Sequence, residues 1–240
     1  MSANSGYGQF CPVAKAAEVV TTRWTPLVLR ELILGSTRFN EIHRGVPTMS
    51  RALLSQRLKE LEQVGVIARV LPEGRKSAEY HLTKMGQELK PIIVALGVWG
   101  QRWVESAVAS NDWDAGALMW DVRRRIDVSA LPETRTVIHF DYEDAPKELS
   151  AWWVVVDNGE VDLCQSDPGF DVDLFVVSDV RTMARVWIGK QSLTGAIDDE
   201  AIFVTGDRQL RTSITSWLLL AKVTEAAQQY ERLFAEEGLT

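Results

Sequence analysis

The stretch Pro47-Thr-Met-Ser-Arg-Ala-Leu-Leu-Ser-Gln-Arg-Leu-Lys-Glu-Leu-Glu-Gln-Val-Gly65 determines how the first part of the chain is organised. At about 100° per residue, its large apolar residues fall on one side of a helix, the stripe that a helix buries in a core. Ser50 is typical of a helix N-cap and Gly65 of the residue that follows a helix, so the sequence predicts both ends. The apolar stripe consists of Leu53, Leu54, Leu58, Leu61 and Val64.

The opposite side of this predicted helix is polar. A helix that enters the major groove of DNA presents its first turns to the base edges, where Arg reads guanine, Gln reads adenine and Ser pairs with either. Arg57 falls among the leucines by angle, so its head must reach solvent, find a buried partner or meet a phosphate. The candidate DNA contacts are Ser50, Arg51, Ala52, Ser55, Gln56 and Lys59, with Arg38 from the preceding segment.

The flanks of this helix follow a helix-turn-helix order. A short predicted helix, Asn40–Arg44, leads through Gly45-Val-Pro47 into the polar-faced helix. Two predicted strands follow at 66–71 and 78–82, joined by a turn that carries Arg75 and Lys76 at its tip. Such a hairpin is a wing whose tip can meet backbone phosphate, the alternative being an ordinary solvated turn. Before them, helices are expected at 12–20 and 23–34.

A long helix is predicted from Lys84 to Ser110, capped by Thr83 and bent or interrupted at Pro91. Its apolar stripe contains more large side chains than one short hairpin can cover. Helix-turn-helix proteins commonly pair to read two half-sites, so a homodimer interface fits this stripe. Packing against a second domain is the competing explanation. The stripe consists of Ile92, Leu96, Trp99 and Trp103.

Length and charge divide the chain into two parts. Its 240 residues suffice for two domains, expected at 1–110 and 111–240. Residues 1–100 hold 13 Lys and Arg against 8 Asp and Glu, whereas the remainder holds 13 against 25. A basic half joined to an acidic half places DNA contact in the first half. The start of the chain lacks the features of a signal peptide and no apolar run is long enough to span a membrane, so a cytoplasmic location is expected.

The first half resembles the HxlR-type transcriptional regulators over roughly residues 10–105. This resemblance implies a dimeric winged-helix protein that binds double-stranded DNA with the helix at 50–64. The wing Glu73-Gly-Arg-Lys76 differs from the Pro-rich wings of the family, which leaves contacts there open. The runs that carry the resemblance are Cys11-Pro-Val-Ala-Lys15, Arg23-Trp24, Leu29-Arg-Glu-Leu32, Arg38-Phe-Asn-Glu41, Leu54-Ser-Gln-Arg-Leu58 and Leu61-Glu-Gln-Val-Gly65.

Some members of that family sense oxidants through a cysteine near the N-terminus, and Cys11 stands at the matching place. A thiol at a helix N-terminus lies at the positive end of the helix dipole, which favours the thiolate. A cysteine kept only for packing is the alternative.

The second half shows strands followed by helices, an order typical of an α+β layer domain with an antiparallel sheet. Asp157-Asn-Gly159 is a strong hairpin signal. Phe203–Asp207 is expected only to connect two helices. The strands are expected at 135–141, 149–156, 160–165 and 172–177, and the helices at 113–126, 179–188, 208–221 and 222–235.

Part of this half resembles the sterol-carrier-protein type of lipid-binding domain. The matching runs are Thr182–Lys190 and Phe203–Leu210, with Gly195 between them. This resemblance implies an apolar small-molecule ligand between sheet and helices, with Trp152, Phe175, Met183 and Trp187 as candidate contacts. Trp152 and Trp153 should lie on opposite faces of a strand, so at most one of them lines the same cavity. The alternative is an ordinary packed core.

No catalytic signature stands out in the sequence. The three histidines are scattered, and there is no nucleophile elbow, phosphate loop or dinucleotide fingerprint. Two cysteines are too few for a disulfide framework or a zinc site, and no cofactor or metal is expected. The sequence therefore favours a ligand-modulated DNA-binding regulator over an enzyme. Two alternatives remain: a lipid carrier whose winged helix only dimerises, and a regulator that senses oxidants through Cys11.

Overall fold

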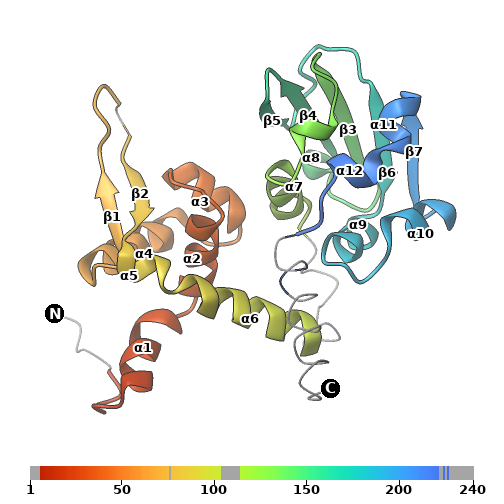
Figure 1. Cartoon of the computed structure of the whole chain (residues 1–240). Helices are drawn as coiled ribbons and strands as arrows, with labels where there is room; N and C mark the ends of the chain where they lie inside the picture. Colours follow the sequence, from red (N-terminus) through yellow and green to blue (C-terminus); the bar gives the residue numbers. More distant parts are fainter. Residues whose placement is uncertain (1–5, 76, 104–113, 222–223, 225, 227–240) are drawn as a thin grey trace. The chain divides into compact units, whose positions relative to one another are not determined.

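The computed structural model describes residues 6–75, 77–103, 114–221, 224 and 226. The chain forms two compact units, Met1–Leu96 and Gly97–Thr240, each of which is described by itself (Figure 1). The expected boundary at 110/111 and most of the expected final helix lie outside the described residues.

The first unit is a winged helix-turn-helix, as the sequence predicts. Its core gathers residues from α2, α4 and the start of β1, together with Ile93 from α6. Strands β1 and β2 pair as an antiparallel hairpin, with Ile67 opposite Leu82. The elements are α1 (Pro12–Val20), α2 (Thr25–Ile33), α3 (Phe39–Gly45), α4 (Arg51–Gln63), β1 (Ile67–Val70), β2 (Glu79–Leu82), α5 (Lys84–Gln87) and α6 (Lys90–Trp103), the last of which crosses the border between the units.

Helix α4 has the ends and the buried stripe that its sequence predicts. The Ser50 hydroxyl accepts a hydrogen bond from the Leu53 amide at 3.3 Å, and Gly65 follows the helix with φ +79°. Leu54, Leu58 and Leu61 are buried. Val64 is 46% exposed, which corrects the prediction that it joins the stripe, because it is the C-cap residue beyond the last helical turn.

The long helix expected from Lys84 is two helices. Thr83 caps α5 by accepting a hydrogen bond from the Gly86 amide at 3.3 Å. Pro91 lies in the first turn of α6, where a residue without an amide proton loses no intrahelical hydrogen bond. Proline therefore interrupts the predicted helix by starting a new one.

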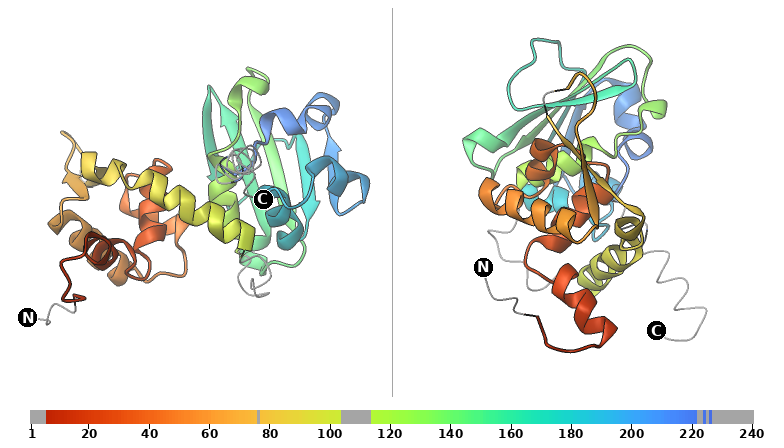
Figure 2. Two further views of the ribbon diagram at one scale, coloured as in Figure 1. Left: turned by 60° about the horizontal axis from the view of Figure 1, so that its bottom comes forward. Right: turned by 90° about the vertical axis from the view of Figure 1, so that its left-hand side faces the viewer.

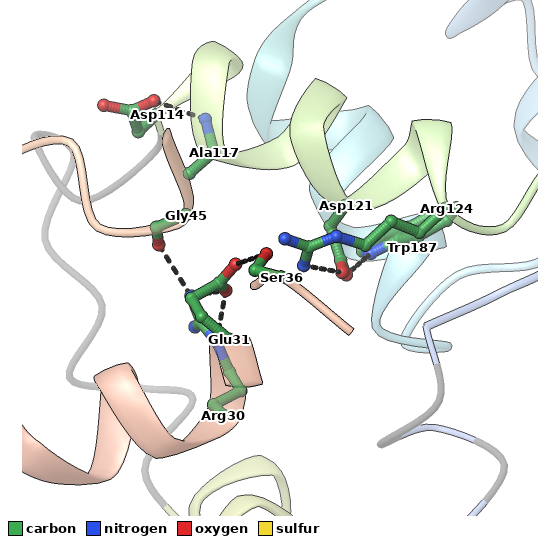
Figure 3. A network of polar contacts seen from close by, with 9 residues as sticks. All are labelled: Arg30, Glu31, Ser36, Gly45, Asp114, Ala117, Asp121, Arg124 and Trp187. Carbon is green, nitrogen blue, oxygen red and sulfur yellow. Dashed lines mark hydrogen bonds and ion pairs between the residues drawn. The ribbon is translucent and has the colours of Figure 1, made fainter. Parts of the chain in front are cut away.

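A buried carboxylate ties α2 to the turn of the helix-turn-helix (Figure 3). Glu31 is 1% exposed and accepts from the Arg30 guanidinium at 2.9 Å and from the Ser36 hydroxyl at 3.3 Å. The same guanidinium donates to the carbonyl of Gly45 at 2.7 Å, at the end of α3. Charge-assisted hydrogen bonds of this kind fix geometry well, so the network sets the position of α3 relative to α2.

The second unit contains a sheet of five strands in the order β5-β4-β3-β6-β7. The sheet is mixed, which corrects the antiparallel prediction: β3 and β6 are parallel because the loop after β5 returns the chain to the starting end of β3. Asn158 and Gly159, both with positive φ, form the predicted tight turn between β4 and β5. The strands are β3 (Thr136–Tyr142), β4 (Ala151–Asp157), β5 (Glu160–Cys164), β6 (Leu174–Ser178) and β7 (Ile202–Gly206).

Helices pack on one face of this sheet and form the core with it (Figure 2). Strand β7 occupies the segment expected to be only a connection, and α10 was not predicted. The helix expected at 208–221 is two short helices that meet at Ser213. The helical segments are α7 (Ala115–Arg123), the short η3 (Val128–Ala130), α8 (Lys147–Ser150), α9 (Val180–Trp187), α10 (Leu193–Asp198), α11 (Arg208–Thr212) and α12 (Ile214–Trp217).

Candidate nucleic-acid interface

The polar face of α4 is exposed while its leucines lie in the core. The folded unit therefore fixes the axial rotation of the helix and directs one set of side chains outward. This is the arrangement that a helix needs in order to enter a major groove. The exposed residues include every candidate of the polar face and its cap: Ser50, Arg51, Ala52, Ser55, Gln56 and Lys59.

Two of these side chains are held by neighbours. Arg51 donates to the side-chain oxygen of Asn40 at 2.8 Å, and its guanidinium lies 4.9 Å from the centre of the Phe39 ring. Gln56 donates to Glu60 at 2.9 Å. These contacts orient polar groups at the surface without burying them.

Arg57 is held inside the unit. Its guanidinium pairs with Glu60 and donates through Nε to the carbonyl of Arg23 at 3.2 Å. Its side chain is only 16% exposed. The sequence left three possibilities for the head of Arg57: solvent, a partner within the protein, or a phosphate. The structure shows a partner within the protein. Arg57 thus positions α4 against the segment between α1 and α2.

A carboxylate that sequence reasoning overlooked brings two predicted contacts together at the wing. Glu79, on β2, accepts from Arg75 at 3.1 Å and forms an ion pair with Arg38 at 3.7 Å. His81 lies 3.2 Å from its other oxygen. The guanidinium side chains of Arg38 and Arg75 are about half exposed, whereas Glu79 is 17% exposed. The sequence spacing of Arg75 and Glu79 does not indicate that Arg38 is near them. Only the fold brings Arg38 to the carboxylate of Glu79. Lys76, the other predicted wing contact, lies outside the described residues.

Three of the four predicted ligand contacts of the second unit lie in its core. Trp152, Met183 and Trp187 are buried in the same cluster. The indole of Trp152 donates to the Leu149 carbonyl at 2.7 Å, and that of Trp187 donates to Asp121 at 2.8 Å (Figure 3). Phe175 projects from the opposite face of the sheet, because it alternates with the buried Leu174 and Val176. The four residues therefore do not surround one cavity.

The predicted redox residue is the N-cap of α1. Cys11 is half-buried and free, and its side chain makes no capping hydrogen bond. Pro12 takes the first helical position, as the sequence predicts. Within the residues that the structure describes, no group of His, Cys, Asp and Glu is arranged to hold a metal ion. Across the same residues, no helix has the length and apolar character to cross a membrane.

Comparison with known proteins matches the first part of the chain. Residues 19–108 fit the model of the family described as HxlR-like helix-turn-helix. The HTH-type transcriptional regulator YvaP of Bacillus subtilis (strain 168) is 40% identical over 99 residues, which is 40% of this chain and 92% of that protein. The regulator YodB of the same organism is 35% identical over 97 residues, covering 40% of this chain and 87% of its own length. A solved structure titled as the redox regulator HypR in its oxidized form is 32% identical, with a TM-score of 0.37, and the match covers 38% of this chain and 96% of that one.

Proposed function

Because the chain belongs to the HxlR-like helix-turn-helix family of transcriptional regulators, we propose that it acts as a homodimer that reads pseudo-palindromic DNA through α4. The observation that carries this proposal is the two-sided character of α4. Its leucines lie in the core, while its cap and the side chains of its polar face are exposed to solvent.

In this proposal, side chains are divided between base edges and phosphates. Arg51, Ser55 and Gln56 are of the types that read bases in the major groove, and Lys59 supplies charge one turn later. Ser50 and Ala52 lie at the start of the helix, close to the DNA. Arg38, Arg75 and Lys76 meet the backbone on either side, which sets register without reading sequence. The excess of basic residues in the first 100 supports DNA contact in this half.

Dimerisation is proposed through α6. Ile92, Leu96, Trp99 and Trp103 recur at helical spacing, and each is more than half exposed in the single chain. Large apolar side chains gathered in this way are typical of protein–protein interfaces. A second copy is the partner that a helix-turn-helix protein needs in order to read two half-sites.

The second unit is proposed to bind an apolar small molecule between its sheet and its helices, in the manner of a sterol-carrier-type domain. Its apolar core includes Trp152, Met183 and Trp187. Such a ligand changes DNA binding only if its affinity differs between the DNA-competent and incompetent states of the dimer.

The deciding experiment compares Gln56→Ala/Lys59→Ala with the wild type by fluorescence anisotropy. Each is titrated into labelled fragments of the upstream DNA and into random DNA, across a salt series. We expect the double variant to lose about tenfold to a hundredfold in affinity for the selected fragment, because one base contact and one phosphate contact disappear. Its affinity for random DNA and its salt slope should fall only slightly.

The matched control is Gln87→Ala/Lys90→Ala, which removes the same residue types from exposed positions outside α4. It should bind as the wild type does. Equal binding by all three proteins would show that the polar face of α4 does not recognise the DNA sequence. A wild type without selectivity over random DNA would favour the second candidate, a lipid carrier whose winged helix serves only for dimerisation.

A response to oxidants is proposed through Cys11, since its thiol stands at the first turn of α1. We expect diamide to change the DNA affinity of the wild type severalfold and to leave Cys11→Ser unchanged, because only the thiolate is readily oxidised. Cys164→Ser is the matched control and should respond as the wild type does. An unaltered response in Cys11→Ser would end this proposal.

A further inference from the structure

The face of the second unit's sheet that points away from the helical core carries a row of aromatic side chains. Strand register places His139 opposite both Trp153 on β4 and Phe175 on β6. Cys164 lies beyond Trp153 on β5. Phe203 on β7 pairs with Val177 and so points to the same side. Within the described part of the chain, α7 and α9 to α12 contribute their buried side chains to the other face.

The rings of His139, Trp153 and Phe175 contact one another, and the phenylalanines of the row are exposed. The His139 ring centre lies 4.6 Å from that of Trp153 in a tilted arrangement and 5.6 Å from that of Phe175, edge to face. Phe175 is 39% exposed and Phe203 is 57% exposed. Exposed aromatic side chains on one face of a sheet offer a platform for a flat aromatic ligand.

The charges around this platform are negative. Strands β3 to β7 contain no Lys or Arg, whereas Asp141 and Asp162 point to the same side as the rings. Asp167, in the loop after β5, is close enough to act electrostatically on His139. Burial lowers the pKa of His139 more than Asp141 and Asp167 raise it, which disfavours a positive charge on the imidazole.

One end of this face already shows a cation against a ring. The guanidinium of Arg135 lies 4.1 Å from the ring centre of Phe170. Its charge is matched by Asp157 at 2.8 Å, so it does not neutralise Asp141 or Asp167. A second copy of the face would bring carboxylates against carboxylates, which disfavours self-pairing.

We infer that this face, centred on His139, Trp153 and Phe175 and bordered by Asp141 and Asp167, binds flat organic cations. A cation is attracted to aromatic faces and carboxylates together, and its apolar rings cover the exposed platform. The site is separate from the apolar ligand site proposed above, and its occupation requires no DNA.

The test uses rhodamine 6G as the cationic probe and fluorescein as an anionic probe on the same ring system. Anisotropy is measured with the full-length protein in the absence of DNA. We expect rhodamine 6G to bind with saturation, and fluorescein to bind at least about tenfold more weakly. Asp141→Asn/Asp167→Asn should weaken rhodamine binding about tenfold, and Trp153→Ala should weaken it by a similar factor.

Asp198→Asn/Asp199→Asn is the matched control, because it removes the same charge from exposed positions at the end of α10. It should bind rhodamine 6G as the wild type does. No saturable binding, equal binding of the two dyes, or equal losses in the two Asn double variants would each overturn the inference. If Trp153→Ala fails to fold, the comparison of Asp141→Asn/Asp167→Asn with its control still tests the inference. Loss of DNA selectivity alone would count against the proposed regulator and not against this site.

Discussion

Gly86→Ala is expected to lower the free energy of unfolding of the first unit by about 3 kcal/mol. Gly86 is buried in α5, and a β-carbon there would fall on the backbone carbonyl oxygen of Val66, far inside van der Waals contact. That carbonyl also accepts from the Thr83 amide at 3.1 Å and from the Thr83 hydroxyl at 3.1 Å, which hold it in place. Backbone fixed in this way cannot withdraw as a flexible side chain can, so α5 must separate from the start of the hairpin.

Gly100→Ala is the matched control, since it makes the same change in another helix, where a β-carbon would meet nothing within 4 Å. Alanine is the better helix former, so this variant should be more stable by about 0.5–1 kcal/mol. Urea unfolding followed by circular dichroism measures both. Similar changes in stability in the two variants would show that the backbone of Val66 can move away from a β-carbon at position 86, contrary to this prediction.

Trp99→Glu is expected to convert the proposed dimer to a monomer and to lower affinity for a two-half-site DNA fragment by about a hundredfold or more. Trp99 is 58% exposed at the centre of the α6 stripe. In the proposed dimer, its replacement would bury a carboxylate without a partner. The monomer then binds one half-site at a time, without the high effective concentration that a linked second reader provides. Light scattering gives the mass, and anisotropy gives the affinity.

Phe203→Glu is the control for this prediction. Its side chain is 57% exposed, so the change in polarity at the surface is similar, but it belongs to β7 and not to the α6 stripe. It should leave both the mass and the DNA affinity unchanged. A dimer that survives Trp99→Glu would place the subunit contact elsewhere, and a wild-type monomer would remove the proposal.

Sequence periodicity predicts most of α4 because the signals of this helix are local. A cap at Ser50, a glycine at position 65 and leucines at helical spacing each act within α4, and the structure has them where the pattern predicts. The polar face followed from the same periodicity. Its exposure was therefore predictable before any tertiary contact was known.

Other features depend on contacts between distant segments. Glu79 joins Arg38 and Arg75 only because the start of α3 pairs with β2. The parallel pairing of β3 and β6 depends on where the chain returns after β5, which no alternation of residues encodes. Trp152 and Phe175 are both candidate contacts of an apolar ligand by the sequence resemblance, but their registers place them on opposite faces of the sheet.

The carboxylate of Glu79 has a consequence for how the wing would meet DNA. Arg38 and Arg75 already have an anionic partner in the free protein. At these two positions, proposed phosphate contact is therefore an exchange of one anion for another and not the neutralisation of a bare cation. An arginine that leaves a carboxylate for a phosphate therefore releases fewer condensed ions from the duplex than an arginine without an anionic partner would. A logarithmic plot of affinity against salt should accordingly be shallower than the number of arginines at the interface suggests.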